Sequence, residues 1–399
     1  MFTAITKSGQ IISLLSRPHD PFLVDDKSPF FCPACSERVV LKKGTIRRWH
    51  FAHQNKTNCF SQSEPETEEH LHGKSVLYEW LTTKGFSPIL EAFLPSINRK
   101  ADLLFTWKTQ TFALEFQCSS ISTEEALQRS SDYLSIEVMP IWIYSLQRLR
   151  QKGKGRFSVQ SFEWTGLRER NIDSRHALIY LCPAAASFYY LFPRAMPSAS
   201  FLYADVYSLP VFDSPVEHIV NLPPTVNGPV VWNSDWLHQK KTWRFSSSQW
   251  RGKPDKTYIR QVFAGYRSDL PFFPAEAGWP ILSMEIFRTP PYIWQSWLLL
   301  CFLPKLPLYQ RFSLRMVIEA LEPLLYDNTF MIRDLPFLSS PIEKAVYFYL
   351  ELLKHIGILT NTGSGWKKIN NIILPLSLED AFHMDKKWSS NIFYKGTLD

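Results

Sequence analysis

The sequence lacks any hydrophobic run long enough to cross a membrane. Its longest apolar stretch, Trp297–Leu303, falls far short of the roughly 18–20 apolar residues that a membrane-spanning helix needs. The start of the chain also lacks the apolar core of a signal peptide, because Lys7 and several Ser and Thr residues interrupt it. We therefore expect a soluble, cytoplasmic protein without a membrane span.

Cysteine is also scarce. The six Cys residues are scattered over 399 positions, which is too sparse for the disulfide framework of a small secreted protein. Disorder is disfavoured as well, since 45% of the residues are apolar, and the length is enough for two or three domains with their own cores. The net charge of +7 tilts the chain mildly toward polyanionic partners such as nucleic acid.

The first motif is a metal-binding pattern near the N-terminus. Cys32 and Cys35 form a Cys-x-x-Cys knuckle, and His50, His53 and Cys59 follow it. Two thiolates from one tight turn can both reach a zinc ion. We favour Cys32, Cys35, His53 and Cys59 as the ligands of a structural Zn²⁺, with His50 as the alternative to His53. The competing interpretation is two incidental Cys residues in a turn beside surface His residues.

A second pattern predicts an α/β domain between Glu68 and Tyr144. Gly85 ends its first helix, and a capping box that begins at Ser122 starts its second. The expected elements are a helix over Glu68–Lys84, strands over Pro88–Leu94, Arg99–Trp107 and Thr111–Cys118, a helix over Ser122–Ile136 and a strand over Val138–Tyr144. The last strand–helix–strand unit has the length of a right-handed parallel crossover.

Polar side chains interrupt the two central strands of this domain. Glu115 and Gln117 share one face of an otherwise apolar strand, and Asp102 lies on the strand before it. A carboxylate in such surroundings is costly unless it is paired or binds a metal. Oxygen ligands of this kind hold Mg²⁺ or Mn²⁺, which can activate water for attack on a phosphodiester. Gln117 stands where a Lys often occurs, and it cannot supply a positive charge.

Two alternatives stay open for these residues. The carboxylates can instead form a structural ion-pair network with basic neighbours, namely Arg99, Lys100 or Arg129. On the first helix, the apolar stripe continues backward at helical spacing to Lys74, His70 and Glu66. Those three residues either face the same cleft as the carboxylates or belong to a solvated helix start.

The order of elements, with Asp in the second strand and Glu-x-Gln in the third, resembles the restriction-endonuclease-like PD-(D/E)XK superfamily in its E-x-Q variant. Residues 25–145 resemble more narrowly the competence protein CoiA family. The motifs that carry this resemblance, all in order, are Cys32-Pro-x-Cys35, His50-Phe-Ala-His53, Glu66-Thr67-x-Glu69-His70 with Lys74, Arg99-x-Ala-Asp102, Glu115-x-Gln117-x-Ser119, and Arg129 with Tyr133.

The resemblance implies a nuclease-like protein of natural transformation in Gram-positive bacteria. Such a protein acts in the cytosol on incoming single-stranded DNA during processing or recombination, with recombination or competence proteins as partners. Carried over, Asp102, Glu115 and Gln117 are the catalytic positions, with Mg²⁺ or Mn²⁺ at the two carboxylates. The supporting residues of the first helix are His70, Lys74 and Glu66. For Arg129 the resemblance implies either a contact to phosphate or a role in holding the site together, and the competing role is an ion pair with Glu115 in the ligand-free protein.

Further basic residues invite a nucleic-acid interpretation. Arg47 and Arg48 beside the knuckle are candidate phosphate contacts, although solvated arginines are the commoner outcome. The basic segment 147–156 reads as a linker that can touch phosphates. Trp and basic residues interleave over 232–253, which suits stacking of single-stranded nucleic acid, but Trp at spacings of four and seven favours a helical core stripe.

The second half predicts an α+β region. Short β segments are expected at His176–Cys182, Ser187–Phe192, Phe201–Val206 and 230–232. Two helices, Leu314–Tyr326 and Pro341–His355, precede a β-hairpin and suggest a winged helix over 312–375. The expected division is a zinc-knuckle module over 1–62, a nuclease-like domain over 63–150 and a C-terminal region over 151–399. The alternative function is a catalytically weak or inactive DNA-binding adaptor that recruits recombination factors.

Overall fold

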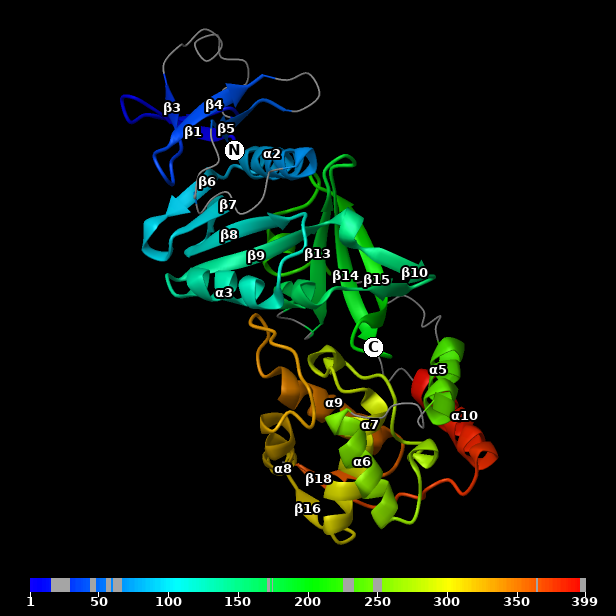
Figure 1. Ribbon diagram of the computed structural model, residues 1–399. Coiled ribbons are helices and arrows are strands. Elements are labelled where there is room, and N and C mark those ends of the chain that lie inside the picture. The colour runs from blue at the N-terminus through cyan, green and yellow to red at the C-terminus, as the bar shows by residue number, and fades with distance from the viewer. Residues whose placement is uncertain are drawn as a thin grey trace.

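A computed structural model describes most of the chain. The described residues are 1–15, 29–43, 48–54, 59, 67–170, 173, 175–224, 233–246, 253–363 and 365–394. They form a small N-terminal sheet, a large central sheet and a mainly helical C-terminal half (Figure 1). The expected strand at 230–232 and the site candidates Arg47 and Glu66 lie outside the described residues.

The N-terminal module is a five-stranded antiparallel sheet. Its strands follow the order β2-β1-β3-β4-β5. They are β1 (Thr3–Thr6), β2 (Ile11–Ser13), β3 (Phe30–Phe31), β4 (Arg38–Lys42) and β5 (His50–His53). The β1–β2 hairpin turns at the Ser-Gly pair near residue 9, where Gly9 adopts a φ of 82°. The positive φ of Gly9 lets the two strands turn back on each other.

The central sheet has ten strands, and two of its pairings are parallel. Its order is β10-β11-β15-β14-β13-β9-β8-β7-β6, with β12 pairing only with β13. The strands that hold the candidate site are β6 (Ile89–Leu94), β7 (Arg99–Trp107), β8 (Gln110–Gln117) and β9 (Val138–Ser145). The β8–β9 pairing is parallel, as the predicted crossover requires.

Two helices cover opposite faces of this part of the sheet (Figure 1). Thr67 caps the N-terminus of helix α2 (Glu68–Thr83), because its hydroxyl accepts a hydrogen bond of 3.2 Å from the His70 backbone amide. Helix α3 (Thr123–Leu134) starts at Ser122 in the same way. Gly73 lets α2 approach β8 closely, because a Cβ atom there would lie 2.1 Å from a ring carbon of Phe116. This close approach brings the first turns of α2 to the edge of the site.

The sheet continues past residue 150, where the sequence suggested a boundary. Its further strands are β10 (Arg150–Gly153), β11 (Arg156–Ser158), β12 (Arg168–Glu169), β13 (His176–Cys182), β14 (Ser187–Ala195) and β15 (Phe201–Pro210). Strand β13 pairs in parallel with β9, with Ile179 opposite Ile143. Backbone hydrogen bonds therefore join the predicted core and the following β segments into one sheet.

The C-terminal half packs its helices around a large apolar core. The helices of this half are α5 (Asn233–Ser246), α6 (Pro254–Gly265), α7 (Pro291–Trp297), α8 (Leu314–Tyr326), α9 (Pro341–His355) and α10 (Leu378–Tyr394). The short helix α4 (Glu217–Val220) belongs instead to the apolar cluster that joins the central sheet to α2 and the N-terminal module. A three-stranded sheet lies beside α8 and α9, in the order β16-β18-β17; its strands are β16 (Arg311–Phe312), β17 (Leu359–Asn361) and β18 (Trp366–Lys368). This is the helix–helix–hairpin unit that the sequence predicted.

Two Trp residues and two basic residues of α5 belong to the core. Trp236 and Lys240 are fully buried, and Trp243 and Arg244 are nearly so. Lys240 donates to two backbone carbonyls, while Arg244 forms hydrogen bonds of 2.8 and 2.9 Å with Asp385 of α10. The core interpretation of this stripe is confirmed for the part of α5 that the structure describes. Over the same described residues, no helix is both long and apolar enough to pass through a membrane.

Candidate functional site

The candidate site lies where strands β7 and β8 separate. Their backbone pairing runs from Trp107↔Gln110 to Leu103↔Leu114, one residue short of Asp102 and Glu115. Beyond that point β7 stays with β6, while β8 stays with β9. The two carboxylates therefore sit at the opening between the diverging strands.

Asp102 fills this opening from the β7 side. Its Oδ2 atom accepts the Phe116 amide at 2.9 Å, so the side chain substitutes for a backbone partner of β8. The same atom lies 3.1 Å from Nε2 of His70 on α2. Burial alone would raise the pKa of Asp102, but His70, the Lys74 ammonium and the Phe116 amide together hold it well below its usual range. Asp102 is therefore ionised at neutral pH.

Glu115 is held from the α3 side. Its two oxygens accept hydrogen bonds from the Arg129 guanidinium and the Tyr133 hydroxyl. Burial raises the pKa of Glu115, and the nearby Asp102 charge acts in the same direction, against the lowering effects of Arg129 and Tyr133. The alternative that the sequence offered, an ion pair between Glu115 and Arg129, is thus present.

Arg129 is itself fixed by three neighbours. Besides Glu115, its guanidinium approaches Gln117 Oε1 at 3.5 Å and lies 4.9 Å from the centre of the Trp142 ring. The Gln117 amide donates to the backbone carbonyl and the hydroxyl of Ser119, both at 3.0 Å. Glu115, Gln117 and Arg129 therefore form one connected group at the end of β8.

Lys74 occupies a different position from the one expected. It is fully buried, and its Nζ atom donates to Glu91 Oε1 at 2.5 Å. Glu91 lies within β6, where it adopts a φ of 51° between the pairs Leu90↔Leu103 and Ala92↔Ala101. Its other oxygen accepts hydrogen bonds from the backbone amides of Phe2 and Thr3, at the start of β1, at 2.8 and 3.0 Å. Lys74 influences Asp102 through its charge, while its ammonium points to Glu91.

Sequence reasoning missed Glu91. The signal was available, because Glu91 is a carboxylate inside the apolar stretch Pro88–Leu94, the same pattern that singled out Glu115. Of the two basic candidates near the knuckle, Arg48 is described and forms an ion pair of 3.7 Å with Glu68 on α2. That pair is half-exposed, which leaves Arg48 at the surface beside the first helix.

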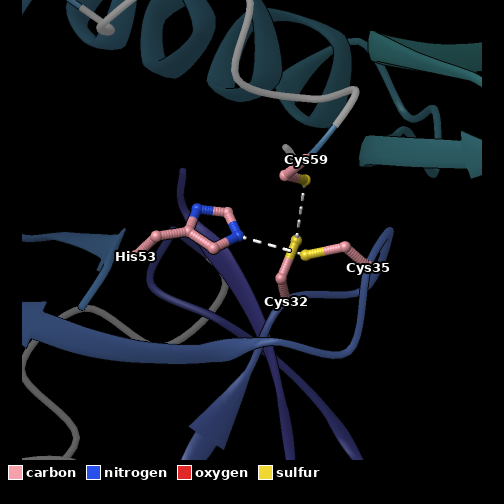
Figure 2. A group of neighbouring side chains, drawn as sticks. All are labelled: Cys32, Cys35, His53 and Cys59. Carbon is pink, nitrogen blue, oxygen red and sulfur yellow. Dashed lines mark hydrogen bonds between the residues drawn. The ribbon is translucent and has the colours of Figure 1, made fainter. Parts of the chain in front are cut away.

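A second group of ligand-type residues lies in the N-terminal module. Single ligand atoms of Cys32, Cys35, His53 and Cys59 all fall within 4.8 Å of one another, and Figure 2 shows the four side chains converging. The Cys32 and Cys59 sulfur atoms are 3.9 Å apart. A tetrahedral zinc ion with Zn–S bonds of about 2.3 Å separates its sulfur ligands by about 3.8 Å. This group has the donors and spacing that a structural zinc site requires.

The pKa values of this group show which protonation states a bound cation would change. Burial, followed by the neighbouring Cys59 and Cys32 thiols, raises the pKa of Cys35 to about 12 despite a favourable hydrogen bond from the Glu37 backbone. A cation among the sulfur atoms would favour the thiolate instead. Burial lowers the pKa of His53, whose neutral ring is the form that binds metal. His50, the alternative ligand, instead contacts the Arg48 carbonyl through Nδ1 at 2.8 Å.

Three family models match consecutive parts of this chain. They are the N-terminal domain of competence protein CoiA over residues 23–62, its nuclease-like domain over 66–222 and its C-terminal domain over 232–371. The chain belongs to the competence protein CoiA family. Competence protein CoiA of Bacillus subtilis (strain 168) is 27% identical over 271 residues, which is 68% of this chain and 71% of the relative. The search of solved structures finds no match.

The CoiA matches divide the chain in the way its sheets do. The part matched by the N-terminal domain contains the Cys and His cluster, and the nuclease-like match contains Asp102, Glu115 and Gln117. The nuclease-like match also extends over β10 to β15, which the structure joins to the same sheet. The chain is thus a CoiA family member with a nuclease-like domain on a large mixed sheet.

Proposed function

We propose that this protein hydrolyses DNA phosphodiester bonds with the help of Mg²⁺ or Mn²⁺. The observation that carries the proposal is the pair Asp102 and Glu115, placed at the opening between β7 and β8 and close enough that the charge of Asp102 raises the pKa of Glu115. Two buried carboxylates that repel one another are stabilised by a divalent cation.

The donor set fits such a cation. Carboxylate and amide oxygens are the hard ligands that Mg²⁺ and Mn²⁺ prefer. Each Glu115 oxygen already accepts one hydrogen bond, but a carboxylate oxygen has two lone pairs, so one per oxygen is left for a metal. Asp102 and Glu115 would hold the cation. When bound, the cation supplies a more acidic water and polarises the phosphodiester.

The remaining residues position this pair and its substrate. His70 and the Phe116 amide hold Asp102 in its ionised form. Arg129 orients Glu115 and offers positive charge to a phosphate, and Gln117 orients a water molecule without providing a charge. Lys74 is a positioning residue, since its ammonium is bonded to Glu91 and its charge lowers the pKa of Asp102.

The biological setting follows from the family. We infer a role in natural competence, with incoming single-stranded DNA as the substrate, recombination or competence proteins as partners, and the cytoplasm as the location. The support is the family assignment and the name of the Bacillus subtilis relative. The Cys32, Cys35, His53 and Cys59 group would hold a structural Zn²⁺, because four protein ligands leave no open position for substrate.

The decisive experiment is a cleavage assay on labelled single- and double-stranded DNA with Mg²⁺ or Mn²⁺. We expect Asp102→Ala and Glu115→Ala to lose cleavage by about 100-fold or more and to keep DNA binding. Asp132→Ala is the matched control, because that carboxylate pairs with Arg99 and accepts a hydrogen bond from Gln128. Equal cleavage by both site variants and the wild type would refute the catalytic assignment.

A second candidate function is a DNA-binding adaptor without catalysis. The ion pairs at the site favour it. Arg129 pairs with Glu115 and Lys74 pairs with Glu91, and Gln117 carries no positive charge that could stabilise a reacting phosphate. In the same assay, an adaptor would bind DNA in the wild type and in both site variants, and none of the three would cleave it.

The zinc assignment has its own test. Purified protein should contain about one equivalent of zinc, and Cys32→Ser combined with Cys35→Ser should remove it and lower the melting temperature. Cys182→Ser is the control, since that free thiol lies on β13 outside the cluster. Less than about half an equivalent of zinc in the wild type, or an unchanged content in the double variant, would contradict the assignment.

A further inference from the structure

The β10–β11 hairpin presents a group of exposed basic residues. Strand β10 ends the central sheet and has β11 as its single neighbour in the strand order. All four residues of β10 are exposed, and so is Lys154 in the turn that follows. Arg150, Lys152 and Lys154 carry three positive charges here, and segment 146–158 contains no acidic residue.

This hairpin begins beside the loop that follows the site strand. Arg148, two residues before β10, donates to the Cys118 carbonyl at 3.1 Å and to the Ser120 hydroxyl at 3.2 Å. Gln117 of the candidate site donates to Ser119 in the same loop. A continuous set of contacts therefore leads from the opening between the strands to the first residue of β10.

The two arginines at the base of the hairpin are already held by the fold. Arg148 lies 3.4 Å from the Glu163 carboxylate and 4.6 Å from the Phe162 ring centre. Arg156 lies over the rings of Phe201 and Tyr203, at 5.5 and 5.9 Å. These contacts anchor the base, and the three exposed cations of the hairpin project beyond it.

We propose that the β10–β11 hairpin binds the phosphate backbone of the DNA strand that enters or leaves the candidate site. This proposal deepens the proposed function and rests on DNA being the substrate. Side chains two residues apart on a strand share a face and lie about 7 Å from each other, a separation similar to that of neighbouring phosphates in an extended nucleic-acid strand. Arg150 and Lys152 have this two-residue spacing along β10, whose register with β11 shifts between Gln151 and Gly153, and Lys154 follows in the turn. Contacts to phosphate alone would give affinity without sequence preference.

The test is a binding titration with the full-length protein, without added Mg²⁺ or Mn²⁺. The probe is a fluorescein-labelled single-stranded oligonucleotide, and the variant combines Arg150→Ala, Lys152→Ala and Lys154→Ala. We expect its affinity to fall by more than about tenfold, and the slope of log K against log salt concentration to decrease by about two, since each lost phosphate contact removes about 0.7. The exchange Arg150→Lys, Lys152→Arg and Lys154→Arg should keep most of the affinity.

The control variant removes the same charge elsewhere. It combines Lys305→Ala, Arg311→Ala and Arg315→Ala, three exposed residues near β16 and α8 at the far end of the molecule (Figure 1). Equal losses in the control and the hairpin variant would show a net-charge effect and overturn the proposal, as would an unchanged slope in the hairpin variant. Loss of binding to anionic phospholipid vesicles with unchanged DNA affinity would also overturn it, in favour of a membrane contact.

The outcome is separable from that of the cleavage assay. Wild-type protein that binds DNA through the hairpin but never cleaves it would leave this proposal standing and refute hydrolysis. If the wild type cleaves DNA and the hairpin variant binds and cleaves it equally well, hydrolysis would stand and the hairpin proposal would be refuted.

Discussion

At the scale of single residues, Tyr133 orients the Glu115 carboxylate and lowers its pKa. The ring is fully buried on α3, and its hydroxyl donates to the Glu115 carboxylate. Burial and the Glu115 charge raise the pKa of Tyr133 well above its ordinary value, so the phenol stays a donor. That hydrogen bond in turn lowers the pKa of Glu115, against the raising effect of burial.

The substitution Tyr133→Phe should therefore move the acidic limb of the pH–rate profile to higher pH. Without the hydroxyl, the pKa of Glu115 rises further, and the ionised form that binds metal is reached only at higher pH. We also expect a loss of about 1–3 kcal/mol in the free energy of unfolding, because a hydrogen bond to a charged group is removed.

Tyr144→Phe is the matched control for this substitution. Tyr144 is equally buried, and its hydroxyl donates to the Glu163 carbonyl at 3.0 Å. Both variants should lose stability, but only Tyr133→Phe should shift the profile of kcat/KM against pH. The same acidic limb in all three proteins would mean that Glu115 does not titrate in the reaction.

Sequence reasoning reached Glu115 because this carboxylate interrupts an apolar strand, where a buried charge is costly unless it is paired or binds a metal. It reached Asp102 because a short hairpin joins its strand to that of Glu115. It did not reach the partner of Lys74. Helical spacing placed Lys74 on the stripe that faces the sheet, but it carries no information about which carboxylate lies opposite. The positive φ of 51° at Glu91 goes with the tertiary contacts that its carboxylate makes with α2 and with the start of β1.

At the scale of elements, the Glu91 carboxylate joins three of them. One oxygen takes the Lys74 ammonium of α2, and the other takes the backbone amides of Phe2 and Thr3 in β1 together with the Thr3 hydroxyl at 2.8 Å. Lys74 and Glu91 are both buried. The Glu91 carboxylate thereby joins the N-terminal module to two elements of the site domain.

Replacing Glu91 with Gln should destabilise the protein by about 3–5 kcal/mol, because the Lys74 charge remains buried without its counterion. Lys74→Met alone should cost a similar amount. The double variant should regain a substantial part of the lost free energy of unfolding, since both members of the ion pair are removed together. Urea denaturation of all four proteins measures the coupling energy, and strictly additive losses would contradict a direct buried ion pair.

Local signals predicted individual elements well. The first helix was expected over Glu68–Lys84 and is found over Glu68–Thr83, and the strand expected over Thr111–Cys118 is found over Gln110–Gln117. Pairing between distant elements was harder to predict. An apolar segment such as His176–Cys182 reads as a buried strand, but nothing in its own residues indicates that it pairs with β9 rather than with a second sheet.

At the scale of the whole molecule, buried polar contacts join the central sheet to the C-terminal half. Arg333 donates to the Glu285 and Phe287 carbonyls in the C-terminal half and to the Ala199 carbonyl between β14 and β15. Its guanidinium lies 4.7 Å from the centre of the Trp164 ring. His176 of β13 reaches the Glu285 carboxylate at 2.5 Å. Arg333 and Glu285 thus form the centre of this contact.

A second contact at the same boundary involves the helix–helix–hairpin unit formed by α8, α9 and the three-stranded sheet. Glu169 of β12 accepts the amide and the hydroxyl of Ser339 and pairs with Lys344 on α9. In a winged helix, the second of these helices is the one that enters DNA. Here the first turn of α9 is occupied by the central sheet, which favours a structural role for this unit and leaves the exposed hairpin as the stronger candidate for DNA contact.

The substitution Arg333→Met should therefore uncouple the two halves. It leaves three buried carbonyls without their donor, at a cost of about 1 kcal/mol or more each, while the aliphatic chain still covers the Trp164 ring. We expect calorimetry to show the wild type unfolding in one transition and the variant in two, with one half melting earlier. Arg315→Met is the control, since that side chain is 87% exposed. The lost hydrogen bonds weaken the boundary between the halves and leave both apolar cores intact. A variant that melts in one transition at a lower temperature would contradict the prediction and show that the two halves form a single cooperative unit.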